Sequence, residues 1–160
     1  MSYLIDGHNL IPKIPGLSLQ QIDDEARLID MLQVFCRVHR KKVEVYFDQA
    51  PAGRAGIRHF GMVTVHFVRQ GLTADEAILE KINQLQQTAR NWIVVTSDRH
   101  IQVQARAMHA EVISSEEFSI QLEESLQKAS EKSKSQPEKL NQDEVEEWLR
   151  IFHAGGKHIK

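Results

Sequence analysis

The sequence predicts an α/β protein with a mostly parallel β-sheet, on the basis of three observations. Short stretches rich in β-branched and aromatic residues alternate with helix-like stretches. The strand-like stretches are nearly continuous apolar runs, which is typical of strands covered by helices on both faces. The chain has 160 residues, 41% of them hydrophobic, which is enough for one domain with a substantial core.

The individual elements follow from local patterns. Strands are expected at residues 2–5, 43–48, 63–68, 92–97 and 111–114. Helices are expected where apolar residues recur at helical spacing, at residues 21–40, 74–89, 99–109 and 114–129. Loops are expected where Pro, Gly and Ala gather, at residues 10–19 and 49–61.

The composition changes after Ala129. Residues 1–129 are expected to form the globular domain, residues 130–140 a polar, solvated linker, and residues 141–160 a C-terminal helix and tail. Asn141 would cap that helix and Gly155 would stop it. Its apolar face either packs back on the domain or docks onto a partner, and consists of Val145, Trp148, Leu149 and Phe152.

Charge and cysteine content exclude several classes of protein. The net charge of −2 provides no global basic field that would attract nucleic acid, although a local basic patch is still compatible with it. Cys36 is the single cysteine, which excludes an internal disulfide and a cysteine-rich zinc site. No apolar run approaches the roughly 20 residues that cross a bilayer. The chain begins with a strand pattern and not with a signal peptide, so we expect a cytoplasmic protein without membrane contacts.

Acidic residues follow the predicted strands. Asp6, Asp48 and Asp98 come at three strand ends, and a fourth strand leads through a short loop to Asp75 and Glu76. The carboxyl ends of parallel strands meet at one edge of a sheet, where ligand crevices form. We therefore expect these carboxylates to converge. Each also has a purely structural reading, as a turn former, a helix N-cap or a first-turn helix charge.

Clustered carboxylates repel one another unless a cation lies among them. Oxygen ligands, without cysteine or suitably spaced histidines, favour Mg²⁺ or Mn²⁺. Such an ion can activate water and stabilise a departing oxygen, as the hydrolysis of a phosphodiester requires. Asn9 could orient Asp6 or a phosphate, and Thr96 and Ser97 could supply hydroxyl groups beside Asp98.

Four blocks carry a family resemblance. YLIDGHN, VYFDQAP, GLTADEAILEKI and IVVTSDRH, in this order, resemble the NYN-domain proteins of the YacP type, within the PIN-like nuclease superfamily. The resemblance spans about residues 3–120. It implies a Rossmann-like three-layer α/β/α sandwich and a metal-dependent endoribonuclease activity.

The same resemblance assigns roles to particular residues. The family's acids fall on Asp6, Asp75 and Asp98, with Asn9 beside them and Asp48 as a further candidate metal ligand. Independently of the resemblance, Glu76 is a candidate metal ligand or a plain first-turn helix residue. His8 departs from the pattern, because many relatives have Tyr there. It could stack on a base, contact a phosphate or cap the loop.

Cations accompany the acids along the chain. The candidate RNA-binding residues lie close to the acidic positions, and are His8, Arg54, Arg58, His59, Arg69 and Arg99. They would form a basic rim that holds phosphates around an acidic centre. An edge crevice favours a single strand over a duplex, so single-stranded RNA is the expected partner, either free or in a ribosome or another ribonucleoprotein.

The leading interpretation is therefore a Mg²⁺- or Mn²⁺-dependent endoribonuclease. One alternative is a module that binds RNA or a ribonucleoprotein without cutting it, with the Trp148 helix as a docking element. A second is a small-molecule phosphohydrolase. Such enzymes often carry another Asp two positions after the nucleophile, whereas Gly7 and His8 follow Asp6.

Overall fold

The computed structural model describes residues 1–17, 23–135 and 151. The strands are β1 (Ser2–Asp6), β2 (Val43–Ala50), β3 (Gly56–Phe60), β4 (Val63–Arg69), β5 (Trp92–Val95) and β6 (Glu111–Ile113). The α-helices are α1 (Gly7–Leu10), α2 (Asp24–His39), α3 (Ala74–Leu85), α4 (Arg99–Ala107) and α5 (Ser115–Ser135). Short 3₁₀ helices cover Ile11–Lys13 and Gln86–Asn91.

The strands form one sheet in the order β3-β4-β2-β1-β5-β6. The pairs β1–β2, β1–β5, β2–β4 and β5–β6 are parallel, and β3–β4 is antiparallel. The predicted α/β class with a mostly parallel sheet is thus confirmed. Because β1 lies inside the sheet, its carboxyl end opens between β2 and β5.

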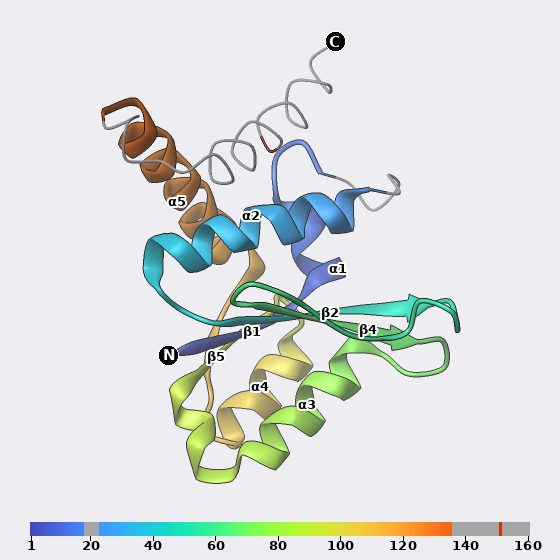
Figure 1. Cartoon of the computed structure of the whole chain (residues 1–160). Coiled ribbons are helices and arrows are strands. Elements are labelled where there is room, and N and C mark those ends of the chain that lie inside the picture. The colour runs from blue at the N-terminus through green and yellow to red at the C-terminus, as the bar shows by residue number, and fades with distance from the viewer. Residues whose placement is uncertain (18–22, 136–150, 152–160) are drawn as a thin grey trace.

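Helices cover both faces of the sheet. Helices α2 and α5 lie on one side of it and α3 and α4 on the other (Figure 1). Neighbouring residues of β1 serve the two faces in turn: Ile5 packs in the core under α2 and α5, and Leu4 in the core over α3 and α4. This arrangement is the predicted three-layer α/β/α sandwich, and it explains why the strands read as continuous apolar runs.

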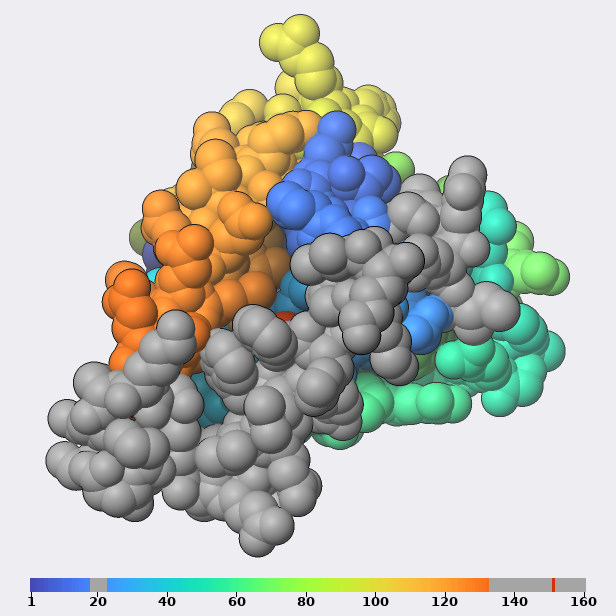
Figure 2. All heavy atoms as spheres, turned by 90° about the horizontal axis from the view of Figure 1, so that it is seen from above, coloured from blue at the N-terminus to red at the C-terminus, as the bar shows by residue number. Residues whose placement is uncertain are grey.

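The prediction of a loop at residues 49–61 is wrong in its second half, because β3 lies there and pairs with β4. All five residues of β3 are exposed, so the strand has no alternation of buried and exposed residues to reveal it. The expected loop at residues 10–19 is also wrong at its start, because residues 10–13 belong to α1 and the following 3₁₀ helix. The segment after β1, in blue, lies directly beside α5, in orange (Figure 2).

The C-terminal part differs from the prediction as well. Helix α5 continues to Ser135, so the predicted linker is wrong over residues 130–135. Its Glu, Lys and Ser residues are polar but compatible with an exposed helix. The rest of the predicted linker and C-terminal helix, with Val145, Trp148, Leu149 and Phe152, lies outside the described residues; Ile151 alone of that region is described, and it is helical. None of the described helices is long and apolar enough to cross a membrane.

Candidate active site

Asp6 and Asp75 form a carboxyl pair at the carboxyl end of the central strand. Asp6 ends β1 and is only 8% exposed, while Asp75 lies in the first turn of α3. Burial, a hydrogen bond with Asp75 and the negative charges of Asp75 and Asp48 raise the pKa of Asp6 to about 7, against the opposing effect of the Asn9 N–H. Near neutral pH, Asp6 therefore still holds its proton in part of the molecules.

Asp75 is held in place by the start of α3. Thr73 caps the helix, with its hydroxyl oxygen accepting the Glu76 N–H at 3.1 Å, and the Glu76 carboxylate accepts the Thr73 N–H at 3.5 Å. This reciprocal capping box sets the direction of the first turn. It also employs the Glu76 carboxylate in the cap, so the structure supports the helix-capping reading of Glu76 and assigns it no interaction with Asp6.

His8 joins two carboxylates at the same edge. Its Nδ1 lies 2.8 Å from Asp48 Oδ1 and its Nε2 lies 2.6 Å from Glu25 Oε2. The hydrogen bond to Glu25, followed by the one to Asp48, raises the pKa of His8 against the opposing effect of burial. Both ring nitrogens are engaged, so His8 offers no nitrogen to RNA. It clamps the start of α2 to the end of β2 instead.

Asp48 does not end its strand as predicted. Strand β2 continues to Ala50, and its register with β4 shifts between Phe47 and Ala50. Gln49 has a left-handed φ of 60°, which marks a bulge at this point. The bulge leaves Asp48 beside His8, and Asp48 acts on Asp6 through its charge.

Gly7 has a packing role that composition alone does not reveal. A Cβ atom at this position would lie 2.3 Å from Cε1 of Phe47, a ring that is fully buried in the core. Only glycine lets α1 approach β2 this closely. The glycine of DGHN therefore brings His8 within reach of Asp48.

Asn9 organises the edge with both its backbone and its side chain. Its N–H donates to Asp6 Oδ1 at 3.4 Å. Its side-chain oxygen accepts the Ser97 N–H at 2.9 Å and the Ser115 hydroxyl at 2.6 Å. That oxygen thus ties α1 to the segment after β5 and to the start of α5. Lys13 strengthens the same junction through an ion pair with Glu116 at 3.0 Å.

Asp98 is the N-cap of α4. Its Oδ1 accepts the His100 N–H at 2.9 Å and the Ile101 N–H at 3.4 Å. The charges that raise the pKa of Asp6 are those of Asp75 and Asp48, and Asp98 is not among them. Strand β5 ends at Val95, so Asp98 stands three residues beyond the strand. Thr96 supports the turn, because its hydroxyl accepts the Asp98 N–H at 3.2 Å.

The predicted RNA-binding cations occupy two zones. Arg54, Arg69 and Arg99 are exposed near the carboxyl ends of β2, β4 and β5. Arg58 and His59 lie in β3, opposite Val65 and Thr64, and therefore away from the strand ends. His59 Nδ1 lies 3.2 Å from the Thr64 hydroxyl. The predicted single rim is thus divided between the edge and the outer strand.

We call the strand ends at which Asp6, Asp48 and Asp75 lie the acidic edge. Its carboxylate oxygens are ligands that suit a hard cation. Asp6 and Asp75 present carboxylate oxygens, and a cation could take the place of the proton that Asp6 retains. Among residues 1–17, 23–135 and 151, no group of three or more His, Cys, Asp or Glu side chains is arranged to hold a metal ion. The pair of Asp6 and Asp75 is therefore the part of the predicted metal site that the fold brings together.

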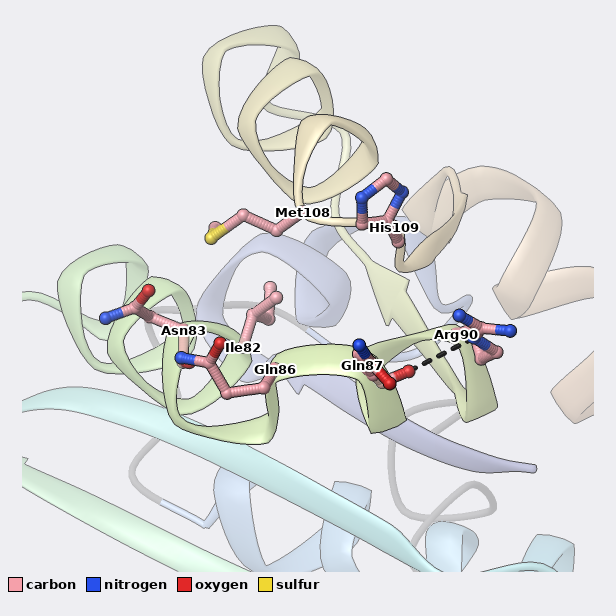
Figure 3. Close-up of a pocket in the computed structure, with 7 residues that line it drawn as sticks. All are labelled: Ile82, Asn83, Gln86, Gln87, Arg90, Met108 and His109. Atoms are coloured by element: carbon pink, nitrogen blue, oxygen red, sulfur yellow. Dashed lines mark hydrogen bonds between the residues drawn. The ribbon is translucent and has the colours of Figure 1, made fainter.

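A cavity of about 660 Å³ lies elsewhere, at the opposite end of α3 from Asp75. Figure 3 shows it between the end of α3 and the end of α4. It is lined by Ile82, Asn83, Gln86, Gln87, Arg90, Met108 and His109, none of which the sequence singled out. This cavity is therefore separate from the acidic residues at the strand ends.

Glu25 is the functional neighbour that sequence reasoning missed. It follows Asp23 and Asp24 at the start of α2, so it looks like an ordinary first-turn acid. Its contact with His8 spans 17 positions. No local pattern marks that pairing.

Comparisons with known proteins agree with this architecture. The family model for the YacP-like NYN domain matches residues 3–152. The crystal structure of Rae1 (YacP) from Bacillus subtilis has a TM-score of 0.74 at 23% identity, covering 96% of this chain and 92% of that chain. A mutant of the same protein has a TM-score of 0.71 at 24% identity, covering 94% and 92%. No curated protein matches the sequence. The chain belongs to the YacP-like NYN domain family, and its domain is of the nuclease type.

Proposed function

We propose that the protein is an endoribonuclease that hydrolyses phosphodiester bonds of cytoplasmic RNA with the help of Mg²⁺ or Mn²⁺. The buried carboxyl pair of Asp6 and Asp75 at the end of β1 carries the proposal. Membership of a nuclease-type family and structural similarity to Rae1 support it.

Asp6 and Asp75 would hold the cation, with Asp48 adding negative charge nearby. When bound, a divalent ion supplies a water of lowered pKa and neutralises charge on the phosphate and the departing oxygen. Asp98 would join the site through the carboxylate oxygen that does not cap α4.

The surrounding residues would keep the acids in place and hold RNA. The Asn9 N–H orients Asp6, and His8 fixes Asp48 against the start of α2. Arg54, Arg69 and Arg99 would bind phosphates of a single strand on either side of the scissile bond. Arg99 stands in the first turn of α4, where a positive charge is unfavourable because of the helix dipole. Its position is therefore better explained by binding of a phosphate than by helix stability.

Cleavage of labelled RNA tests the proposal. Wild type, Asp6→Asn and Asp75→Asn are compared with Mn²⁺ and with EDTA, and RNA is offered both free and on ribosomes. Both variants and EDTA should lower the rate roughly 100-fold or more, as loss of one preorganised electrostatic group does. Glu80→Gln is the matched control, since Glu80 is an exposed acid of the same helix.

Other results would change the assignment. Equal cleavage by wild type and both Asp variants would point to a contaminating nuclease and overturn the proposal. RNA binding that is unaffected by EDTA, without cleavage, would indicate a non-catalytic binding module. Turnover of a generic phosphomonoester in place of RNA would indicate a small-molecule phosphohydrolase.

A further inference from the structure

The segment between the acids Asp48 and Asp75 contains no carboxylate. Residues 49–74 hold Arg54, Arg58 and Arg69 but no Asp or Glu. Of the 20 Lys and Arg residues of the chain, 3 lie in this segment and 17 elsewhere, whereas all 22 Asp and Glu residues lie elsewhere. The segment thus has a net charge of +3, against −5 for the rest of the chain. We call residues 49–69, which include β3 and β4, the acid-free hairpin.

The arginines of the acid-free hairpin have no carboxylate partner among the described residues. Within the part of the chain that the structure describes, no ion pair involves Arg54, Arg58 or Arg69. By contrast, Arg27 pairs with Asp24 at 3.3 Å. Unpaired surface arginines retain their full attraction for phosphate groups and release counterions when they bind them.

The hairpin also presents apolar and aromatic groups to solvent. All of β3 is exposed, with Ile57 at 60% and Phe60 at 37%. Arg58 and Phe60 stand opposite Val65 and Val63, which places them on one face of the sheet. The guanidinium of Arg58 lies over the Phe67 ring, 5.3 Å from its centroid, so it is held extended along this face. Cations beside an exposed aromatic ring suit the backbone and bases of a single strand.

This surface is continuous with the acidic edge. Gly56 pairs with Phe67 and Ala50 pairs with Arg69, so the start of β3 and residues 51–55 lie at the strand ends that include Asp48. Beneath this surface, buried rings connect the two regions, at 5.8 Å between Phe67 and Phe47 and 5.3 Å between Phe47 and His8. A single-stranded nucleic acid lying over Arg58 would therefore lead toward the carboxyl pair of Asp6 and Asp75.

We infer that the acid-free hairpin is a docking surface for single-stranded RNA, so that the preferred substrate is an RNA that extends from the Asp6–Asp75 pair across β3, and not a dinucleotide. This inference rests on the proposed function for its cleavage step. Charge complementarity selects RNA as the occupant. A protein strand that adds to the outer edge of β3 is the competing outcome.

Binding is measured in EDTA, where a metal-dependent enzyme does not cut. The probe is a fluorescein-labelled single-stranded RNA of about 12 nucleotides. Its binding to the full-length protein is followed by fluorescence anisotropy. The double variant Arg54→Gln and Arg58→Gln should bind about tenfold more weakly. Its slope of log K against log salt should be shallower by about 1.4, or 0.7 for each lost phosphate contact. The matched control is Arg90→Gln with Arg106→Gln, two exposed arginines outside the hairpin.

Cleavage provides the second readout. The single variant Arg58→Gln, which keeps Arg54, should raise KM for the 12-nucleotide RNA about threefold and leave cleavage of a dinucleotide unchanged. Absence of cleavage by every protein would overturn the proposed function, yet the binding difference would still support the RNA-docking surface. Equal RNA binding by the hairpin and control variants would overturn this inference. Self-association of the wild type that is lost in the hairpin variant, with RNA binding unchanged, would assign β3 to a protein partner.

Discussion

Asp6 shows most directly how the fold creates chemistry from an ordinary residue. Its folded-state pKa of about 7 lies well above the ordinary carboxyl value of 3.8. The folded state therefore holds a proton that the unfolded chain releases as the pH rises above 3.8. By linkage, this contribution to stability is complete below the unfolded pKa and is lost as pH rises through the folded pKa near 7. Cation binding requires Asp6 and Asp75 to be ionised, and that ionised state makes the metal-free protein less stable.

Asp6→Asn should stabilise the metal-free protein at alkaline pH. The variant removes the repulsion from Asp75, so its Tm should exceed that of wild type by several degrees at about pH 8, and the gap should close toward about pH 4. Thermal unfolding followed by circular dichroism in EDTA measures both values. Glu80→Gln serves as the control and should show no such pH-dependent gap. A constant difference at all pH values would mean that Asp6 does not titrate in this window.

At the scale of single elements, helix α4 has a cap that is also a candidate catalytic acid. Asp98→Ala removes the capping oxygen and should lower the free energy of unfolding by about 1 kcal/mol. Asp98→Asn keeps a capping oxygen and should cost little stability. Urea unfolding and RNA cleavage, measured on both variants, separate the two roles. Loss of cleavage in Asp98→Asn, with stability preserved, is the expected result; retained cleavage would leave Asp98 as a cap alone.

At the scale of the whole molecule, the acidic edge lies at the end of an interior strand, so a cation bound there should stabilise the entire domain. At about 100 times the Kd, binding to the folded state alone adds about 2.7 kcal/mol. For a chain of this size, that corresponds to a rise in Tm of about 5–10 °C. Thermal unfolding with and without Mg²⁺ or Mn²⁺ measures the shift. Asp6→Asn should not respond, and an unresponsive wild type would contradict cation binding at this pair.

Local sequence patterns predicted the class of fold and most of the strands. The apolar runs of β1, β2, β4 and β5 are visible because both faces of each strand are covered. The cap at Asp98 was readable because capping depends on a residue and its next three neighbours. Strand β3 escaped detection, since a strand without a buried face has no hydrophobic period.

Contacts between distant residues were beyond such patterns. The Asn9 side chain meets Ser115 across 106 positions, and His8 meets Asp48 across 40. Gly7 looks like a turn glycine until the Phe47 ring is placed against it. Each of these contacts depends on how helices and strands pack, and one residue type can serve either a turn or a tertiary contact.

The sequence by itself determined that an α/β sheet ends in several acids, because periodicity, turn chemistry and capping are local properties of the chain. Only the tertiary structure decided which acids act together. Asp6 and Asp75 come into contact, Asp48 is held by His8, and Glu76 and Asp98 also serve as caps. The reason is physical: the pKa and the reach of a carboxylate depend on burial and on neighbouring charges, which exist only once the strands and helices have packed.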